Sequence, residues 1–318
     1  MPFIRRKNER LFTLSEHFKV GCTFQVEKFR NDGAVTYRGP EFSNLVLNVG
    51  LDQMASSGFG IAGGNCYYIN VGEGSSTPAQ TQTGLDNFLA ATNNDISSSY
   101  GYQASTPYHK WGQATFEFAI GSCTGNLTEL GLSGSSNAEY FNRQLFRDDA
   151  GDPTTITVKS DEGLRITAKG FFYPDIEPGD TVAGSFLLNG TDTIDTIREM
   201  TADTYWLSRT EYGKMIAIRD PNGRMPFITD SNTAFKAGTG PDSNSEIAYT
   251  NGNYYRDNSY TWAAGTFIGD VNTICFCIGV DWSQAWEFSA FRLTPAITLA
   301  DTDELTLTLR RSWGRYAA

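Results

Sequence analysis

The sequence predicts an all-β protein made of two tandem, internally duplicated antiparallel β-sandwich domains with minor helix. Three features favour this class: a repeat at a nearly constant offset, alternating strands and a composition suited to tight turns. Aromatic residues make up 13 % of the 318 residues and charged residues only 19 %, while glycine occurs 32 times. Such a mixture is typical of many short strands joined by turns.

Two segments of the sequence recur later in the chain. One offset carries Phe118 onto Trp262, and a nearly equal offset carries Leu164 onto Leu305. The two matches occur in the same order, which indicates one β-domain repeated in tandem. Trp262 is therefore expected in a core. The matched positions are Phe118–Gly121, Gly125–Leu127, Leu130, Leu132, Ile156–Val158, Leu164, Ile166, Ala168 and Phe172 in the first copy, and Trp262–Gly265, Gly269–Val271, Ile274, Phe276, Ile297–Leu299, Leu305, Leu307, Leu309 and Trp313 in the second.

The repeat divides the chain into three segments. Residues 1–18 are predicted to form an N-terminal docking arm, residues 19–175 the first sandwich and residues 176–318 the second, diverged sandwich. Pro174–Asp180 is the predicted linker, because its prolines and glycine resist both strand and helix. The first copy carries a long polar loop at residues 75–110 that the second copy mostly lacks, and such loops often contact partners.

Individual elements follow from periodicity. The stretch Asn44–Met54 fits a strand or a short helix, and we favour a short helix at one end of the sandwich. Cys66–Val71 is a strand by composition. Residues 164–172 alternate, with apolar Leu164 on one face and polar Arg165 on the other, and residues 305–310 repeat this pattern. Alternation of this kind is typical of an antiparallel sheet with one solvated face.

The charge balance argues against a nucleic-acid binder. The net charge is −11, whereas affinity for nucleic acid depends on neutralising phosphates with Lys and Arg. The first ten residues are the exception: their basic residues either dock on an acidic partner or belong to a frayed terminus. These residues are Arg5, Arg6, Lys7 and Arg10. With no secretory signal at the start and no apolar run long enough to span a bilayer, we expect synthesis in a cytoplasm and no membrane insertion.

The residues needed for catalysis are sparse. His17 and His109 are the two histidines, and no nucleophile, zinc or phosphate-loop motif accompanies them. We therefore expect no enzymatic activity and no cofactor. The five cysteines, Cys22, Cys66, Cys123, Cys275 and Cys277, are expected to be buried thiols rather than a disulfide framework or a zinc site.

Two acidic clusters occupy the same turn of the two copies. Asp161–Glu162 and Asp301–Glu304 each precede an outgoing strand. Turn chemistry explains them more simply than a pair of catalytic carboxylates. Calcium held by Asp301, Asp303 and Glu304 is an alternative, although the spacing lacks the order of an EF-hand loop.

Aromatic residues outside the repeat are candidates for an interface. Tyrosine rings anchor protein contacts and stack on sugars, but they also pack in cores, and the sequence leaves both options open. The candidates are Tyr100, Tyr102 and Tyr108 near the end of the polar loop, and Tyr254 and Tyr255 in the second copy.

Several blocks in residues 40–173 resemble blocks found in virion structural proteins of tailed bacteriophages, among tail-fibre, tail-tip and other appendage components. The resemblance implies a structural role without catalytic residues. The second copy carries these motifs only in degraded form. The blocks are Asn44–Asp52, Val71–Ala79, Thr115–Gly121, the Gly-Asn-Leu-x-Glu-Leu-Gly segment Gly125–Leu132, and Leu145–Val158.

The resemblance implies a non-enzymatic component of a tailed-phage virion, most simply a tail- or fibre-associated adaptor that binds other virion proteins. Assembly in the host bacterial cytoplasm and a symmetric homo-oligomer are expected, with a trimer favoured because three duplicated chains present six similar domains. The alternatives are a receptor- or glycan-binding module that contacts a host surface glycan, a head decoration protein and, least favoured, a polysaccharide depolymerase.

Overall fold

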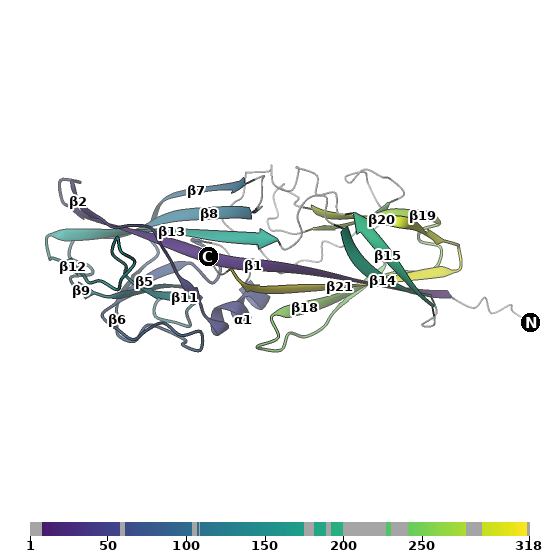
Figure 1. Ribbon diagram of the computed structural model, residues 1–318, viewed down its shortest axis with the longest axis horizontal. Coiled ribbons are helices and arrows are strands. Elements are labelled where there is room, and N and C mark those ends of the chain that lie inside the picture. The colour runs from purple at the N-terminus through teal and green to yellow at the C-terminus, as the bar shows by residue number, and fades with distance from the viewer. Residues whose placement is uncertain are drawn as a thin grey trace, which may run out of the picture. The chain divides into compact units, whose positions relative to one another are not determined.

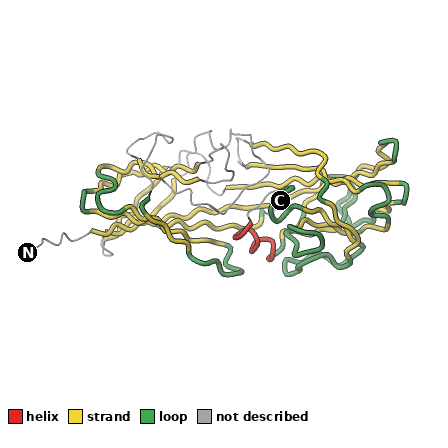
Figure 2. Tube along the Cα trace, turned by 180° about the vertical axis from the view of Figure 1, so that it is seen from behind, coloured by secondary structure: helices red, strands yellow, loops and turns green. Residues whose placement is uncertain are grey.

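The computed structural model shows an all-β protein, which confirms the all-β part of the prediction (Figure 1). The structure describes residues 8–57, 61–103, 107, 109–174, 181–188, 192–199, 227–229, 241–277 and 288–316. Within those ranges, strands dominate and α1 (Asn48–Ser57) is the one helix. Figure 2 sets that helix against the surrounding strands and loops.

The chain folds into two compact units. We call "first unit" the part containing Lys19–Tyr173 and the chain from Trp313, and "second unit" the part containing the described residues up to Phe18 and those from Pro174 to Ser312. The division falls inside strand β1 (Asn8–Arg30) and inside strand β21 (Asp303–Arg315). Residues 8–18, placed in the predicted arm, are thus strand; their docking role and the predicted domain limits stay predictions.

The first unit contains three groups of antiparallel strands. Part of β1 lies beside β13, in the order β1-β13-β8-β7, a five-stranded sheet has the order β4-β11-β10-β5-β6, and β9 pairs with β12. The strands are β2 (Val35–Arg38), β3 (Phe42–Ser43), β4 (Leu45–Val46), β5 (Tyr68–Gly72), β6 (Phe88–Thr92), β7 (Asp95–Gln103), β8 (His109–Phe118), β9 (Gly125–Leu127), β10 (Glu129–Ser133), β11 (Asn142–Leu145), β12 (Ile156–Val158) and β13 (Glu162–Pro174).

The second unit is also antiparallel. Its strands run in the order β16-β19-β20-β15-β14-β1, and β18 pairs with both β17 and β21. The strands are β14 (Thr181–Leu188), β15 (Asp192–Glu199), β16 (Phe227–Thr229), β17 (Ser243–Glu246), β18 (Tyr255–Trp262), β19 (Gly269–Cys277) and β20 (Phe288–Leu299), together with β21.

Alternation places the core as the sequence predicts. On β13, Leu164, Ile166 and Ala168 are buried, and on β21 Leu305 and Leu307 are buried with Leu309. Trp262 is also buried, which confirms its predicted place in a core. Removing apolar side chains from water is the main favourable term in folding, so these positions hold each sheet in its register.

The short helix predicted within Asn44–Met54 is confirmed. It begins at Asn48, after strand β4, and buries Leu51, Met54 and Ala55. The end of the chain packs on it: Trp313 Nε1 donates to the carbonyl of Leu51 at 2.8 Å, and Arg315 Nε donates to the carbonyl of Val46 at 2.6 Å. A segment far away in sequence therefore satisfies backbone acceptors of the first unit.

The same kind of turn occurs once in each unit, at positions that the sequence repeat matches. Phe118 lies opposite Leu164 in the β8–β13 pair, and Trp262 lies opposite Leu305 in the β18–β21 pair. Each strand is followed by the same turn, with a backbone bond from Ser122 to Ala119 in one and from Thr266 to Ala263 in the other. The turn glycines Gly121 and Gly265 have φ values of 75° and 83°, where a side chain would be strained.

The acidic clusters act in turns, as predicted. Glu162 accepts a hydrogen bond from the Lys159 amide at 3.0 Å, and Asp303 accepts one from the Ala300 amide at 3.0 Å. Both carboxylates are buried. Among the described residues, no group of three or more His, Cys, Asp or Glu side chains is placed to hold a metal ion.

A second pair of hydrogen bonds also recurs. The hydroxyl of Thr157 donates to Asn126 at 2.9 Å, and the hydroxyl of Thr298 donates to Asp270 at 2.6 Å. The strands that carry them pair in the same register, Ile156 opposite Leu127 in the first unit and Ile297 opposite Val271 in the second. The same local arrangement thus occurs twice in the chain.

Candidate functional site

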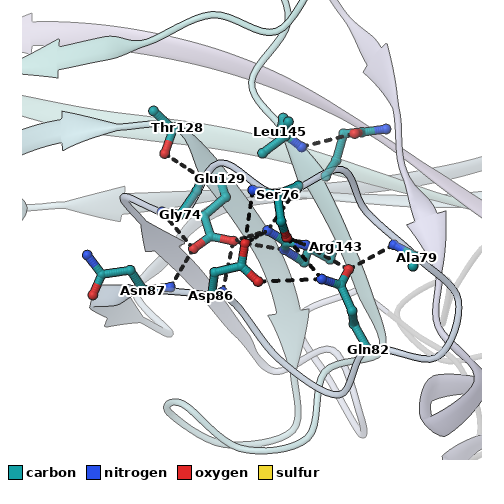
Figure 3. A network of polar contacts seen from close by, with 11 residues as sticks. Gly74, Ser76, Ala79, Gln82, Asp86, Asn87, Thr128, Glu129, Arg143 and Leu145 are labelled. Atoms are coloured by element: carbon teal, nitrogen blue, oxygen red, sulfur yellow. Dashed lines mark hydrogen bonds and ion pairs between the residues drawn. The ribbon is translucent and has the colours of Figure 1, made fainter.

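A buried ion pair lies at the centre of an extended polar network (Figure 3). Glu129, on β10, and Arg143, on β11, are both 0 % exposed. The Nε of Arg143 donates to Glu129 Oε2 at 2.8 Å. Two charges taken out of water are stable only when further hydrogen bonds satisfy their remaining atoms, so the surroundings of the pair are informative.

The Glu129 carboxylate accepts three backbone amides from one loop. Its Oε1 atom accepts hydrogen bonds from the amides of Gly74 at 2.9 Å and Asn87 at 2.8 Å, and its Oε2 atom accepts one from the amide of Asp86 at 3.1 Å. We call residues 75–85, which lie between these anchors, the braced loop. A Cβ atom at Gly74 would overlap the Glu129 carboxylate, so the close approach requires glycine there.

Arg143 holds the same loop from inside. Its Nη1 donates to Gln82 Oε1 at 2.7 Å and to the Ser76 hydroxyl at 3.2 Å. Its Nη2 donates to Asp86 Oδ2 at 2.8 Å and to the Ser76 carbonyl at 3.2 Å. A guanidinium group has five donors in a rigid fork. Here that fork is directed at both ends of the loop, which fixes the loop's conformation.

The surroundings of Asp86 favour its negatively charged form. Desolvation acts to raise its pKa, but hydrogen bonds from Ser76 and the positive charge of Arg143 outweigh it, so the pKa of Asp86 lies below its ordinary value. The carboxylate accepts the Ser76 amide at 3.0 Å. Asp86 is therefore an anion at neutral pH and closes the network on its solvent side.

The braced loop presents an uncharged polar surface. Most of its residues are exposed, including Ser75, Thr77, Ala79 and Gln80. The carbonyl of Gln80 accepts a hydrogen bond from the Asn48 amide at 2.8 Å, which ties the loop to the start of α1. An exposed loop held at its ends and middle loses little conformational entropy when it binds a rigid neighbour.

The network joins blocks that are separate in the sequence. Glu73 Oε1 accepts the Asn126 amide at 3.0 Å, and the Thr128 hydroxyl donates to the Gly74 carbonyl at 2.6 Å. The blocks Val71–Ala79 and Gly125–Leu132 are therefore parts of one structure, and β11 carries Arg143 beside β4 of the Asn44 block. Sequence reasoning missed Glu129 and Arg143. The available signal was the single charged residue between the apolar positions Leu127, Leu130 and Leu132.

The predicted interface residues are placed in part. Arg5, Arg6, Lys7 and Tyr108 lie outside the described residues. In the second unit, Arg10 lies on β1 opposite Leu188. In the first unit, Tyr100 and Tyr102 lie on β7, where Tyr100 is 36 % exposed. In the second unit, Tyr254 and Tyr255 are half-buried, and the Arg310 guanidinium lies 4.0 Å from the Tyr255 ring centre. A role of these residues in an interface stays a prediction.

A row of rings covers the polar face of β8 and β13. The Lys169 ammonium lies 4.4 Å from the ring centre of Trp111, and Phe171 follows on the same strand. The rings of Tyr173 and Tyr316 stack at 3.8 Å. Desolvation, with the charge and hydrogen bond of Tyr316, raises the pKa of Tyr173 to about 12. All five side chains are half-buried, so the row is partly accessible.

The histidines and the described thiols have structural surroundings. His17 Nδ1 lies 2.8 Å from the Ser312 hydroxyl, and His109 Nδ1 lies 2.9 Å from the Pro107 carbonyl. Cys22, Cys66 and Cys123 are buried thiols outside any disulfide, as predicted, and desolvation raises the pKa of Cys22 and of Cys123 to about 12. Thiols of this kind are poor nucleophiles. The side chains of Cys275 and Cys277 lie outside the described set.

No helix among the described residues is long and apolar enough to cross a membrane. Comparisons of the chain with protein-family models, with curated proteins and with solved structures found no match.

Proposed function

We propose that this chain is a non-enzymatic structural component of a tailed-phage virion, most simply a tail- or fibre-associated adaptor. One observation carries the proposal: two of the blocks that resemble phage appendage proteins, Val71–Ala79 and Gly125–Leu132, meet at the Glu129–Arg143 pair, which holds the braced loop in place. Both charged groups are fully buried and their atoms are committed to one another and to the loop. Such a network fixes the conformation of the loop that would contact a neighbour, and it holds the Glu129 carboxylate in hydrogen bonds to three backbone amides and Arg143.

The proposal includes two β-sandwich domains produced by tandem duplication. The recurring turn at Gly121 and Gly265 supports it, as do the matched carboxylates of Glu162 and Asp303. A cation that lies over an aromatic ring also recurs. Lys169 lies over Trp111 in the first unit, and Arg310 lies over Tyr255 in the second. The two pairs are related by the same sequence offsets that carry Phe118 onto Trp262 and Leu164 onto Leu305. Two strand pairs of independent origin would not be expected to have the same register, the same turn and the same side-chain hydrogen bonds.

Duplication supports a particular oligomer. Three duplicated chains present six similar domains, which suits a sixfold tail built from chains with threefold symmetry. The partners are then other virion proteins, and the protein is made in the bacterial cytoplasm before it enters the particle.

Particles purified on a density gradient test the virion role. Mass spectrometry is expected to detect the chain in fixed stoichiometry to the major structural proteins, and gold-labelled antibodies are expected to mark the tail or its fibres. Labelling of the head surface would favour a decoration protein instead. Absence of the chain from infectious particles would refute the proposal. The mass of the purified protein in solution separately tests the trimer.

A glycan-binding module of the same particle is the second candidate. The row of Trp111, Phe171 and Tyr173 beside Lys169 favours it, because aromatic faces stack on sugar rings. An array of bacterial surface glycans tests this function: binding that is lost in Trp111→Ala would support it, and silence on the array would count against it.

A further inference from the structure

Strand β7 is an edge of its sheet among the residues that the structure describes. It pairs with β8 on one side, and within the described ranges no strand pairs with its other side. Successive residues of an antiparallel strand turn their N–H and C=O groups alternately to the two sides, so about half of those in β7 point away from β8. An edge of this kind is a template for another strand.

The usual protections of an edge are weak in β7. The strand has nine residues, and Ile96–Gln103 contains neither charge nor proline. A register shift between Asp95 and Ser97 disturbs one end only. Ile96 is 45 % exposed, and Ser97–Ser99 are exposed as well. Natural edges that stay unpaired are normally short, charged or interrupted by bulges.

The second unit provides an internal comparison. Strand β17 occupies the corresponding place beside β18: Ser245 lies opposite Ser259 as Ser97 lies opposite Thr115. However, β17 has only four residues, ends at Glu246 and follows Asp242. One chain thus carries the same edge twice. It is four residues long in β17, with Asp242 before it and Glu246 at its end, and nine residues long in β7, with no charge after Asp95. The difference indicates that the β7 edge is suited to pairing with a further strand.

We propose that β7 pairs antiparallel with β7 of a second copy of this chain, about a twofold axis at Ser99. Ser99 is the midpoint of the strand, so this register pairs all nine residues. It sets Ser98 opposite Tyr100, and Asp95 opposite the neutral Gln103, so that no like charges meet. The two Tyr100 rings then become diagonal neighbours on one face, within reach of each other.

The pairing goes beyond the proposed trimer, because a twofold contact joins chains two at a time. On its own it gives a dimer. Combined with a threefold axis it gives six copies. The pairing does not depend on where the chain lies in a virion, and its test therefore separates it from the proposed function.

A charge introduced at the axis tests the pairing. In Ser99→Lys, two ammonium groups face each other across the axis, and in Ser99→Glu two carboxylates do so, which destabilises a strand pair. Light scattering at low ionic strength is expected to show that the unmodified full-length protein forms an oligomer with an even number of chains. The oligomer of each variant is expected to have half that number of chains, and an equal mixture of the two variants is expected to regain the original mass. Ser245→Lys on β17 is the matched control and should leave the mass unchanged.

Far-ultraviolet circular dichroism and the Tm establish that each variant is folded, because Ser99 is exposed. A fall from six copies to three in Ser99→Lys would support both the pairing and the trimer. A stable trimer that Ser99→Lys leaves intact would overturn the pairing while sparing the trimer. A single copy of the unmodified chain, or a mixture that fails to reassociate, would also overturn it.

Discussion

The indole N–H of Trp313 donates to the carbonyl of Leu51 at 2.8 Å, across 262 positions of the chain. Both residues are buried, and they join the last described strand to the single described helix of the first unit. The stability of that unit therefore depends on residues that follow the whole second unit in sequence.

Replacing Trp313 tests this dependence. Trp313→Ala is expected to lower the free energy of unfolding of the first unit by about 3–5 kcal/mol, because it opens a cavity and leaves the Leu51 carbonyl without its donor. Trp313→Phe keeps most of the apolar volume and should cost clearly less. Urea titration followed by circular dichroism measures both, and equal stability of Trp313→Ala and the unmodified chain would contradict the expectation.

The buried ion pair is expected to matter more than a surface pair. Arg143→Met leaves the Glu129 carboxylate buried without its counter-ion, a situation that typically costs about 3–5 kcal/mol. Arg38, which pairs with Glu27 and is 63 % exposed, provides the control. Arg38→Met should change stability by about 1 kcal/mol or less.

The braced loop gives a second readout of the same variant. Arg143→Met removes the hydrogen bonds that Arg143 donates to Gln82 and Ser76 of the loop, so protease cleavage within residues 75–85 should become faster than in the unmodified chain. A cleavage rate equal to that of the Arg38→Met control would show that Arg143 does not hold the loop in place.

Acid is expected to destabilise the first unit. The Lys159 amide and the charge of Lys28 hold the pKa of Glu162 below its ordinary value of 4.5 against desolvation, and the pKa of Asp86 lies below its ordinary value of 3.8. Both carboxyls thus contribute stability that is fully present above those ordinary values and is lost as the pH falls through the lower, folded-state values. Urea midpoints measured between neutral pH and about pH 3 should show the decline.

Glu162→Gln isolates one part of that dependence. The variant should be less stable at neutral pH and should lose less stability in acid than the unmodified chain. Asp161→Asn, in the same turn but exposed, is the control and should keep the original pH profile. A Glu162→Gln profile parallel to the original would show that this carboxyl does not contribute to the acid response.

Cleavage in the predicted linker tests how the ends of the chain are held. A protease cut between Pro174 and Asp180 leaves Trp313 and Arg315 on the C-terminal fragment, although both bind the first unit. The two fragments are therefore expected to co-elute in native gel filtration and to separate in urea. Fragments that separate without denaturant would show that these contacts are too weak to join them.

Local patterns were enough to predict part of this fold. The alternation around Leu164 and Leu305 identified their strands, whereas the apolar positions near Leu51 fitted a strand as well as the favoured helix, which the structure shows as α1. The long first strand was missed, because polar and basic residues before Phe18 resemble an exposed arm. Its pairing with β14 depends on residues near Leu188, which no local window contains.

The polar network could not be derived in the same way. Glu129 accepts hydrogen bonds from amides 42 and 55 positions away. The Arg143 side chain can reach the loop only after β10 and β11 have paired. A carboxylate between apolar positions, such as Glu129, indicates that a positively charged partner exists. The sequence does not show which of the 25 Lys and Arg residues is that partner, because strand register decides which one lies beside it.

The bond between Trp313 and Leu51 also affects the order of events on the ribosome. At about 5–20 residues per second, the 262 positions between them take on the order of tens of seconds to translate. Until then, the Leu51 carbonyl and the surface reserved for the indole stay open to chaperones and to neighbouring nascent chains.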